Sequence, residues 1–256
     1  MFYSGHDMMG RELVLPNKPK RIISLVPSIS ESLHELGLEE EVIGITKFCV
    51  HPESWFRSKT RIGGTKNPNL ELIKELNPDL IIANKEENRK EDLLELALFF
   101  PIYISDVNTL NDNQTLLNFL AKIGINKREF IPIAQPFPIL NKRVLYLIWK
   151  GPWMGAAKGT YIDAVLSHCG LDNALDQSKR YPCITEEDWG NLELDYIFYS
   201  SEPYPFKAKD TAELKERFPN AKHLLVDGEM FSWFGTRVSE TFSYFKQKLI
   251  PLLEVH

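Results

Sequence analysis

Short apolar runs alternate along this chain with stretches of helical spacing, a rhythm typical of parallel β-sheets covered by helices. In the first half, apolar runs of strand length lie at residues 21–26, 42–46, 80–83 and 102–104, with helical patterns over 28–36 and 91–99. In the second half they lie at 143–148, 196–199 and 223–226, with helical patterns over 160–169, 210–217 and 238–249. This alternation predicts an α/β protein built from two Rossmann-like lobes.

One helix–turn–strand pattern occurs twice, at residues 69–83 and again at 185–199. In each copy an acid near the start of the helix, Glu71 or Glu187, precedes an aspartate, Asp79 or Asp195, by eight residues. A hydrophobic strand and then a polar loop follow each aspartate. Two similar α/β units in one chain predict two lobes that face each other, and a cleft between lobes is a natural ligand site.

The expected boundaries are an N-terminal α/β lobe over 1–105, a connecting helix and linker over 106–142, and a C-terminal α/β lobe over 143–256. Residues 111–123 have the spacing of a single connecting helix. Prolines at 132, 136 and 138 break its continuation, because proline removes a hydrogen-bond donor and clashes with the preceding turn. The length of the connecting helix stays open.

Local signals predict where the first helix of the N-terminal lobe begins and where the first helix of each lobe ends. Pro27 ends the strand at 21–26, and the segment Ser28–Glu31 has the form of a capping box, in which the Ser28 hydroxyl accepts from a backbone N–H. Gly37 and Gly170 stand where helices commonly stop.

Composition and charge exclude several classes of protein. A hydrophobic content of 43% with 25% charged residues is that of an ordinary globular chain. The net charge of -5 argues against nucleic-acid binding, which needs clustered Lys and Arg. No apolar run approaches the ~20 residues that span a membrane. Residues 1–20 include Asp7, Arg11 and Glu12 without an apolar core, so no signal peptide is expected there.

Common catalytic and metal-binding motifs are also missing from the sequence. The three cysteines form no C-x-x-C pair, and the six histidines form no H-x-H or H-x-x-x-H pair, so no metal site is expected. His51, close to Phe48, is the one candidate axial ligand. The segment 151–160 fails the spacing of a phosphate loop, and hydrolase and dinucleotide motifs do not occur.

At several places the residues resemble a known family. The matching segments are Asp7-Met8-Met9-Gly10-Arg11-Glu12-Leu13-Val14-Leu15-Pro16, Pro19 to Ser28, Gly63-Gly64, Asn69-Leu70-Glu71, Asn77-Pro78-Asp79-Leu80-Ile81, Arg143-Val144 and Phe234-Gly235-Thr236-Arg237. In this order they are similar to the helical-backbone (class III) substrate-binding proteins of ABC importers, the receptors for cobalamin, iron-siderophores and haem. The sequence is most similar to the cobalamin-binding branch.

The resemblance implies two α/β lobes bridged by one long helix, with the ligand in an aromatic cleft between them. It implies a monomeric binding protein and no enzyme, without an intrinsic cofactor, that captures cobalamin or a related corrinoid and delivers it to an ABC permease. A ferric siderophore or haem is the alternative ligand. The implied location is periplasmic or membrane-anchored. A cytoplasmic enzyme or sensor on the same scaffold stays open, because no signal peptide is recognised.

Candidate ligand-binding residues gather in loops that follow the predicted strands, where open α/β sheets bind ligands. They are the aromatics Phe48, Trp149, Trp153, Tyr181, Tyr204 and Trp233, with the acids Glu202 and Glu229. Flat rings bury much apolar area and stack on a planar macrocycle, although loop aromatics also plug cores. The resemblance matches Phe48, Tyr181 and either Trp153 or Met154 to aromatic positions, and Glu229 to an acid.

The first lobe departs from the pattern of the cobalamin branch at two aromatic positions. Thr65 and Asn84 stand there, which implies weaker stacking in that lobe. The loop at 84–88 is expected either to supply amide hydrogen bonds to the ligand or simply to be solvated.

Glu71 and Glu187 have a separate interpretation. The family pairs one exposed acid on each lobe with arginines of the permease, and both residues match those positions. The alternative is that each acid complements the dipole of its own helix.

Overall fold

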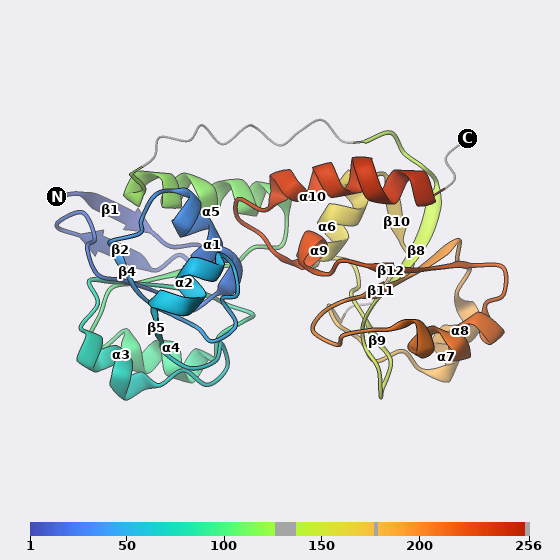
Figure 1. Ribbon diagram of the computed structural model, residues 1–256, viewed down its shortest axis with the longest axis horizontal. Helices are drawn as coiled ribbons and strands as arrows, with labels where there is room; N and C mark the ends of the chain where they lie inside the picture. Colours follow the sequence, from blue (N-terminus) through green and yellow to red (C-terminus); the bar gives the residue numbers. More distant parts are fainter. Residues whose placement is uncertain (126–136, 177–178, 254–256) are drawn as a thin grey trace. The chain divides into compact units, whose positions relative to one another are not determined.

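The computed structural model describes residues 1–125, 137–176 and 179–253, and the chain divides into two compact units (Figure 1). Unit 1 comprises Met1–Val107, Asn111–Pro132 and Phe234–Arg237; unit 2 comprises Asn108–Leu110, Ile133–Trp233 and Val238–His256. The residues assigned from sequence to a separate linker are therefore shared between the two units.

Unit 1 is built on a parallel sheet in the strand order β5-β4-β3-β6-β7. The strands are β3 (Ile22–Ser24), β4 (Val42–Ile45), β5 (Thr60–Arg61), β6 (Leu80–Asn84) and β7 (Ile102–Ser105). The helices are α1 (Pro27–Glu35), α2 (Glu53–Ser58), α3 (Leu70–Leu76), α4 (Lys90–Leu96) and α5 (Leu110–Ile123). Strands β3, β6 and β7 are buried at every residue, as parallel strands covered on both faces are.

Unit 2 has a parallel sheet in the order β10-β8-β11-β12, with the short β9 antiparallel to β8. The strands are β8 (Lys142–Trp149), β9 (Met154–Gly155), β10 (Leu171–Asn173), β11 (Tyr196–Ser200) and β12 (Lys222–Val226). The helices are α6 (Tyr161–His168), α7 (Glu186–Asn191), the 3₁₀-helix η1 (Ala208–Thr211), α8 (Ala212–Arg217), α9 (Glu229–Ser232), α10 (Val238–Tyr244), the π-helix η2 (Phe245–Leu249) and the 3₁₀-helix η3 (Ile250–Leu252). The predicted α/β fold class is confirmed.

The two copies of the repeat fold alike around their aspartates. The Asp79 carboxylate accepts the backbone N–H of Arg21, and the Arg21 carbonyl accepts the N–H of Asp79. Asp195 and Arg143 make the same reciprocal pair. In each unit the aspartate thus fixes the start of a central strand (β6 or β11) against the strand beside it (β3 or β8).

The predicted capping box at the start of α1 is wrong. Val26 is the N-cap residue, no side chain caps the helix, and Pro27 is its first residue. Proline is well suited to that position, because its missing N–H would have no partner in the first turn. The Ser28 hydroxyl is buried and has no hydrogen-bond partner among the described residues. The predicted stops at Gly37 and Gly170 are confirmed, since both have positive φ (79° and 77°).

A short segment near the C-terminus, Phe234–Arg237, belongs to unit 1. The N–H and carbonyl of Gly235 bond the Asn113 side chain, and the N–H of Thr236 donates to the Ser32 hydroxyl at 3.0 Å. Arg237 makes two bonds to the Glu31 carboxylate, at 2.8 and 2.5 Å, with both side chains nearly buried. A side chain at position 235 would collide with Ser32, so glycine is required there.

Several elements were not predicted from the sequence. They include an N-terminal hairpin of β1 (Tyr3–His6) and β2 (Glu12–Leu15), and the short α2, β5, β9, β10 and α9. The helical pattern at 111–123 is confirmed by α5, whereas Pro132 and Pro136 lie outside the described residues. Helix α4 ends at Leu96, before the predicted residue 99.

Candidate functional site

The carboxyl edge of the unit 2 sheet brings together candidate residues that are far apart in sequence. Trp149 is the last residue of β8, Glu202 follows β11, and Glu229 follows β12. Because β8, β11 and β12 run in parallel, their carboxyl ends meet at one edge of the sheet. The sequence prediction that these loops share one region of the lobe is consistent with this topology.

Glu202 is the most closely held of these residues. Its Oε1 accepts a hydrogen bond from the Ser232 hydroxyl at 2.5 Å and another from the Trp233 indole N–H at 3.0 Å. Burial raises the pKa of the Glu202 carboxyl, and the charges of Glu229 and Asp227 act in the same direction. Both donors bond Oε1, so Oε2 is left to accept from another group.

Gly228 allows the two loops of this edge to approach closely. A Cβ at this position would lie 2.6 Å from Glu202 Cγ and would collide with the Ser200 hydroxyl. The Gly228 N–H donates to the Ser201 hydroxyl at 2.9 Å. Sequence reasoning missed Gly228 and Ser232, because their roles depend on the approach of two loops that no local pattern encodes.

Trp149 and Tyr204 form an aromatic pair at the same edge. Their ring centroids lie 5.6 Å apart at an interplanar angle of 73°, and the Tyr204 N–H donates to the Ile148 carbonyl. Trp149 keeps 41% of its surface exposed. Tyr204 in turn packs on the buried Phe206, with centroids 4.7 Å apart. The pair is therefore anchored to the core through Tyr204 and leaves the Trp149 indole partly exposed.

Trp153 is held more firmly within unit 2 than Trp149. Its ring is stacked on Phe206 at 5.9 Å, it meets Trp189 edge-on at 6.4 Å, and its N–H donates to Glu213. Tyr181 is half-buried in the segment that pairs alongside β9, where the Arg180 carbonyl accepts from Ala157. Trp153 lies in the loop between β8 and β9, directly after a parallel strand, whereas Tyr181 precedes α7 and lies near β9.

The carboxyl edge of the unit 1 sheet is polar. Asn84 donates to Ser105 and accepts the N–H groups of Glu86 and Glu87, and Asn88 donates to two backbone carbonyls. Both asparagines are buried, so the expectation that this loop supplies amide hydrogen bonds to a ligand is wrong for their side-chain N–H groups. Phe48, 51% exposed and with the Lys47 ammonium 5.1 Å from its ring centroid, is the accessible aromatic near this edge.

Glu71 and Glu187 occupy the same position in the two copies of the repeat. Each is the second residue of its helix, α3 or α7, and each is exposed. The side chains of Asn69 and Thr185 cap these helices by accepting an N–H from the first turn. Neither glutamate is its helix's capping residue; Glu71 pairs with Lys74 at 2.8 Å.

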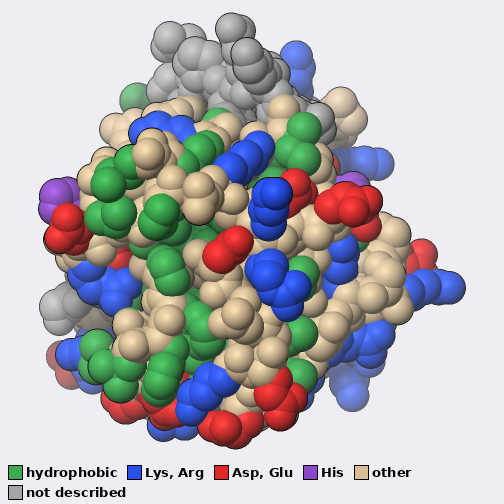
Figure 2. Space-filling model, turned by 90° about the vertical axis from the view of Figure 1, so that its left-hand side faces the viewer, with side chains coloured by type: hydrophobic (Ala, Val, Ile, Leu, Met, Phe, Trp, Pro, Cys, Tyr) green, Lys and Arg blue, Asp and Glu red, His purple; other side chains and the backbone are tan. Residues whose placement is uncertain are grey.

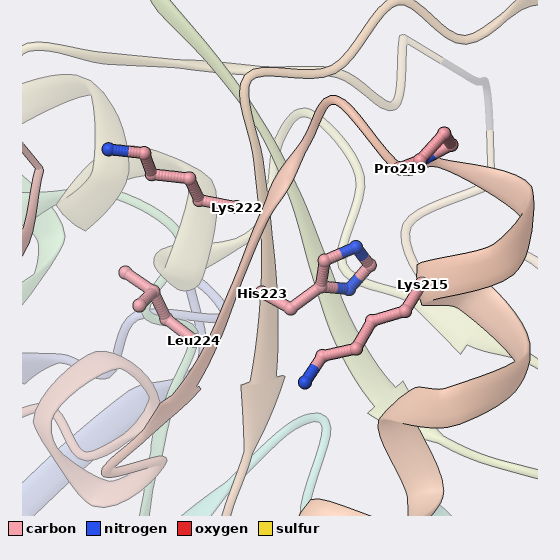
Figure 3. Close-up of a pocket in the computed structure, with 5 residues that line it drawn as sticks. All are labelled: Lys215, Pro219, Lys222, His223 and Leu224. Carbon is pink, nitrogen blue, oxygen red and sulfur yellow. The ribbon is translucent and has the colours of Figure 1, made fainter.

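A hollow of about 500 Å³ lies at the opposite, amino end of β12. Figure 3 shows His223 of β12 and Lys215 of α8 directed to the same side of the strand, while Lys222 and Leu224 point to the other. His223 Nδ1 pairs with the Tyr199 hydroxyl at 2.8 Å and its Nε2 with the Phe218 carbonyl at 3.1 Å. Both ring nitrogens are used within unit 2, so this hollow lacks a metal-binding imidazole.

The described residues, 1–125, 137–176 and 179–253, contain no cluster of His, Cys, Asp and Glu side chains that could hold a metal ion. In the same part of the chain, no helix has the length and apolar character needed to cross a membrane.

Comparison with known proteins identifies sequences and structures that this chain resembles. Residues 22–129 match the periplasmic binding protein family. The chain is 27% identical over 175 residues to the vitamin B12-binding protein of Pectobacterium carotovorum, a match that covers 62% of this chain and 63% of the relative. The matching region thus spans less than two thirds of that relative's length.

Solved structures give the same fold. The chain resembles the periplasmic vitamin B12-binding protein of Vibrio cholerae with a TM-score of 0.73 and 22% identity, over 90% of this chain and 98% of that one. It also resembles a siderophore-binding protein bound to acinetobactin and ferric iron, with a TM-score of 0.71 and 16% identity, over 92% and 94% of the two chains. The predicted resemblance to periplasmic substrate-binding proteins is confirmed, and with it their fold.

Proposed function

We propose that this chain is the substrate-binding component of an ABC importer and that it captures a corrinoid such as cobalamin. The similarity to vitamin B12-binding proteins supports the ligand class. The observation that carries the proposal is the exposed Trp149 ring at the carboxyl edge of unit 2, braced by Tyr204 and placed on the same edge as Glu202.

The chemistry of this edge suits a corrinoid. An exposed indole offers a flat apolar surface for a macrocycle. Glu202 Oε2 and the Glu229 carboxylate offer acceptors for the amide N–H groups that surround a corrin ring. Binding would combine apolar burial with a few hydrogen bonds, while the metal of the ligand stays in its own macrocycle.

A ferric siderophore or haem is the second candidate ligand, because a siderophore-binding protein shares the fold. Haem carries two propionates, and many ferric siderophores are anionic. Such ligands would approach Glu202, Glu229 and Asp227 against like charge, which costs affinity. The acidic edge of unit 2 therefore favours the corrinoid.

Delivery would use Glu71 and Glu187 as contacts for arginines of the permease. Their equivalent, exposed positions on α3 and α7 support this role. A single exposed ion pair contributes at most about 1 kcal/mol, so docking would need both acids and additional contact area. The protein would act as a monomer without catalysis or intrinsic cofactor, in the periplasm or anchored to the outer face of a membrane.

The decisive experiment is a titration of the purified chain, followed by tryptophan fluorescence, with cyanocobalamin, haem and a ferric siderophore run in parallel. Saturable quenching by cyanocobalamin at lower concentration than the other two is the expected result. Tighter binding of haem or the siderophore would transfer the function to that ligand. Absence of binding to all three would contradict the importer role and favour the cytoplasmic enzyme or sensor.

A further inference from the structure

Helix α4 of unit 1 presents large apolar side chains that folding leaves uncovered. Leu93 and Leu96 are buried in the core, at 4% and 0% exposure. On the outer side, Leu94 is 54% exposed, and Leu98 and Phe99, just after the helix, are 79% and 60% exposed. Together these three residues form what we call the α4 apolar face. Contiguous exposed apolar residues mark interaction sites more often than scattered ones do.

The equivalent helix of unit 2 shows that the scaffold does not require this face. Helix α8 follows β11 as α4 follows β6, and it also buries a leucine, Leu214, in the core. Its exposed residues are Ala212, Glu213, Lys215, Glu216 and Arg217, with no large apolar side chain among them. Because unit 2 folds with a charged outer face on α8, folding does not explain why unit 1 has exposed apolar residues on and after α4.

Contacts within unit 1 join the α4 apolar face to the proposed docking acid Glu71. The Lys74 ammonium lies 2.8 Å from Glu71, 2.9 Å from Glu95 and 5.5 Å from the centre of the Phe99 ring. These two hydrogen bonds raise the pKa of Lys74, which keeps the bridge charged. Glu71, Glu95 and Phe99 therefore lie around one lysine, on a continuous surface formed by α3 and α4.

Next to Phe99 lies a hollow of about 430 Å³, lined by residues 97–102 and by 11–14 of the N-terminal hairpin. Its volume is sufficient for one or more side chains of a partner. Figure 2 shows a face of the protein on which hydrophobic side chains gather into patches bordered by charged ones. A surface with apolar patches, a hollow and an acidic border has the composition of a docking site.

We propose that the α4 apolar face extends the permease-docking surface beyond Glu71, and that it receives a basic amphipathic segment of the ABC permease. This inference rests on the proposed function. The charge supports it: Glu71, Glu75, Glu91 and Glu95 are exposed around this surface and outnumber its basic residues, Lys74, Arg89 and Lys90, so a partner should carry Lys or Arg beside its apolar residues. A second copy of this chain fits poorly, because a two-fold contact would bring these acids against one another.

The test is site-specific photo-cross-linking in cells of the organism that encodes the chain. p-Benzoyl-phenylalanine replaces Leu98 in one variant, Lys215 on α8 in a matched control, and Glu71 in a third. After irradiation, cross-linked species are identified by mass spectrometry. The expected result is a product with the membrane subunit of an ABC transporter from positions 98 and 71, and none from position 215.

The other outcomes separate this inference from the function on which it rests. A product from position 71 but none from 98 would overturn the α4 docking surface and leave the importer role standing. Products at neither position would contradict both. A product of position 98 with a second copy of this chain would replace the permease by self-association. Leu98 is exposed, so its replacement should leave the Tm unchanged, and a lowered Tm would disqualify the variant.

Discussion

The sheets of the two units have matching residues at the amino ends of their strands but different side chains at the carboxyl ends. At the amino ends, Asp79 and Asp195 make matching reciprocal bonds with Arg21 and Arg143. At the carboxyl ends, unit 1 is closed by buried amides around Asn84, whereas unit 2 presents the exposed Trp149. The shared residues fix the scaffold, and the function proposed above is assigned to the loops that differ, as expected where sites are grafted on a common fold.

The same contrast holds on the outer helices. Helices α3 and α7 have equivalent caps and equivalent glutamates, yet the next helices differ: α4 has an apolar outer face and α8 a charged one. Comparing the two copies of the repeat therefore distinguishes the residues that folding requires from the residues assigned above to a partner or a ligand. The predictions below test this separation, from the largest expected effect to the smallest.

The contact most specific to unit 1 is the buried pair of Arg237 and Glu31. Arg237→Ala would leave the Glu31 carboxylate without this partner at 12% exposure and should lower the free energy of unfolding by about 3–5 kcal/mol. Denaturant unfolding measures the loss. The control is Arg237→Ala with Glu31→Gln, which removes the buried carboxylate charge and should recover part of the lost stability. A loss below about 1 kcal/mol for the single variant would contradict burial of this pair.

The carboxyl edges should differ most in ligand binding. Trp149→Ala should weaken the binding of cyanocobalamin by about 30-fold, the loss typical of an aromatic anchor worth about 2 kcal/mol. Phe48→Ala, the matched change in unit 1, should weaken it less, because unit 1 otherwise presents a polar edge. Isothermal titration calorimetry measures both. Equal losses, or a larger loss for Phe48→Ala, would contradict the assignment of stacking mainly to unit 2.

The scaffold aspartates should behave alike. Asp79→Ala and Asp195→Ala each remove a carboxylate that accepts backbone N–H groups, and each should cost about 1–3 kcal/mol of stability. Neither should change the affinity for ligand by more than a few-fold, as both lie at the amino ends of their strands. Strongly unequal destabilisation would show that the repeat is similar in sequence but not in its energetics.

Sequence alone could predict the scaffold because its signals are local. The apolar runs give β3, β4, β6, β7, β8, β11 and β12, and the glycines at 37 and 170 stop their helices. Signals that depend on tertiary contact were missed or misread. Ser28 has the pattern of a cap, but Pro27 starts the helix one residue earlier. The short β9 and β10 have only two or three residues each, too few for a period to be recognised.

In the candidate site too, the sequence could predict local features but not contacts between distant loops. The apolar runs allowed the carboxyl ends of β8, β11 and β12 to be located, and the structure has Trp149 as the last residue of β8, Glu202 after β11 and Glu229 at the start of α9 after β12. They could not show that the amides of Asn84 and Asn88 are used inside unit 1, nor that Ser232 and Trp233 hold Glu202. Those are contacts between loops distant in sequence.

The smallest effect should come from the ionisation of Glu202. Its counterpart in unit 1 is Glu86, since each acid stands two residues after the end of its strand, β11 or β6. Burial raises the pKa of Glu202 above that of an ordinary carboxyl. The folded protein therefore retains a proton that the unfolded chain has lost, and the stability associated with this proton is lost as pH rises through the folded-state pKa.

Glu202→Gln keeps an oxygen that can accept from Ser232 and Trp233 but removes the titration. Relative to this variant, the wild-type protein should lose stability as the pH is raised from 4 to 7, as measured by urea unfolding at each pH. Trp233→Phe removes a donor that favours the charged form, so it should move the transition to higher pH. If wild type and Glu202→Gln keep a constant difference over this range, Glu202 does not titrate as a buried acid.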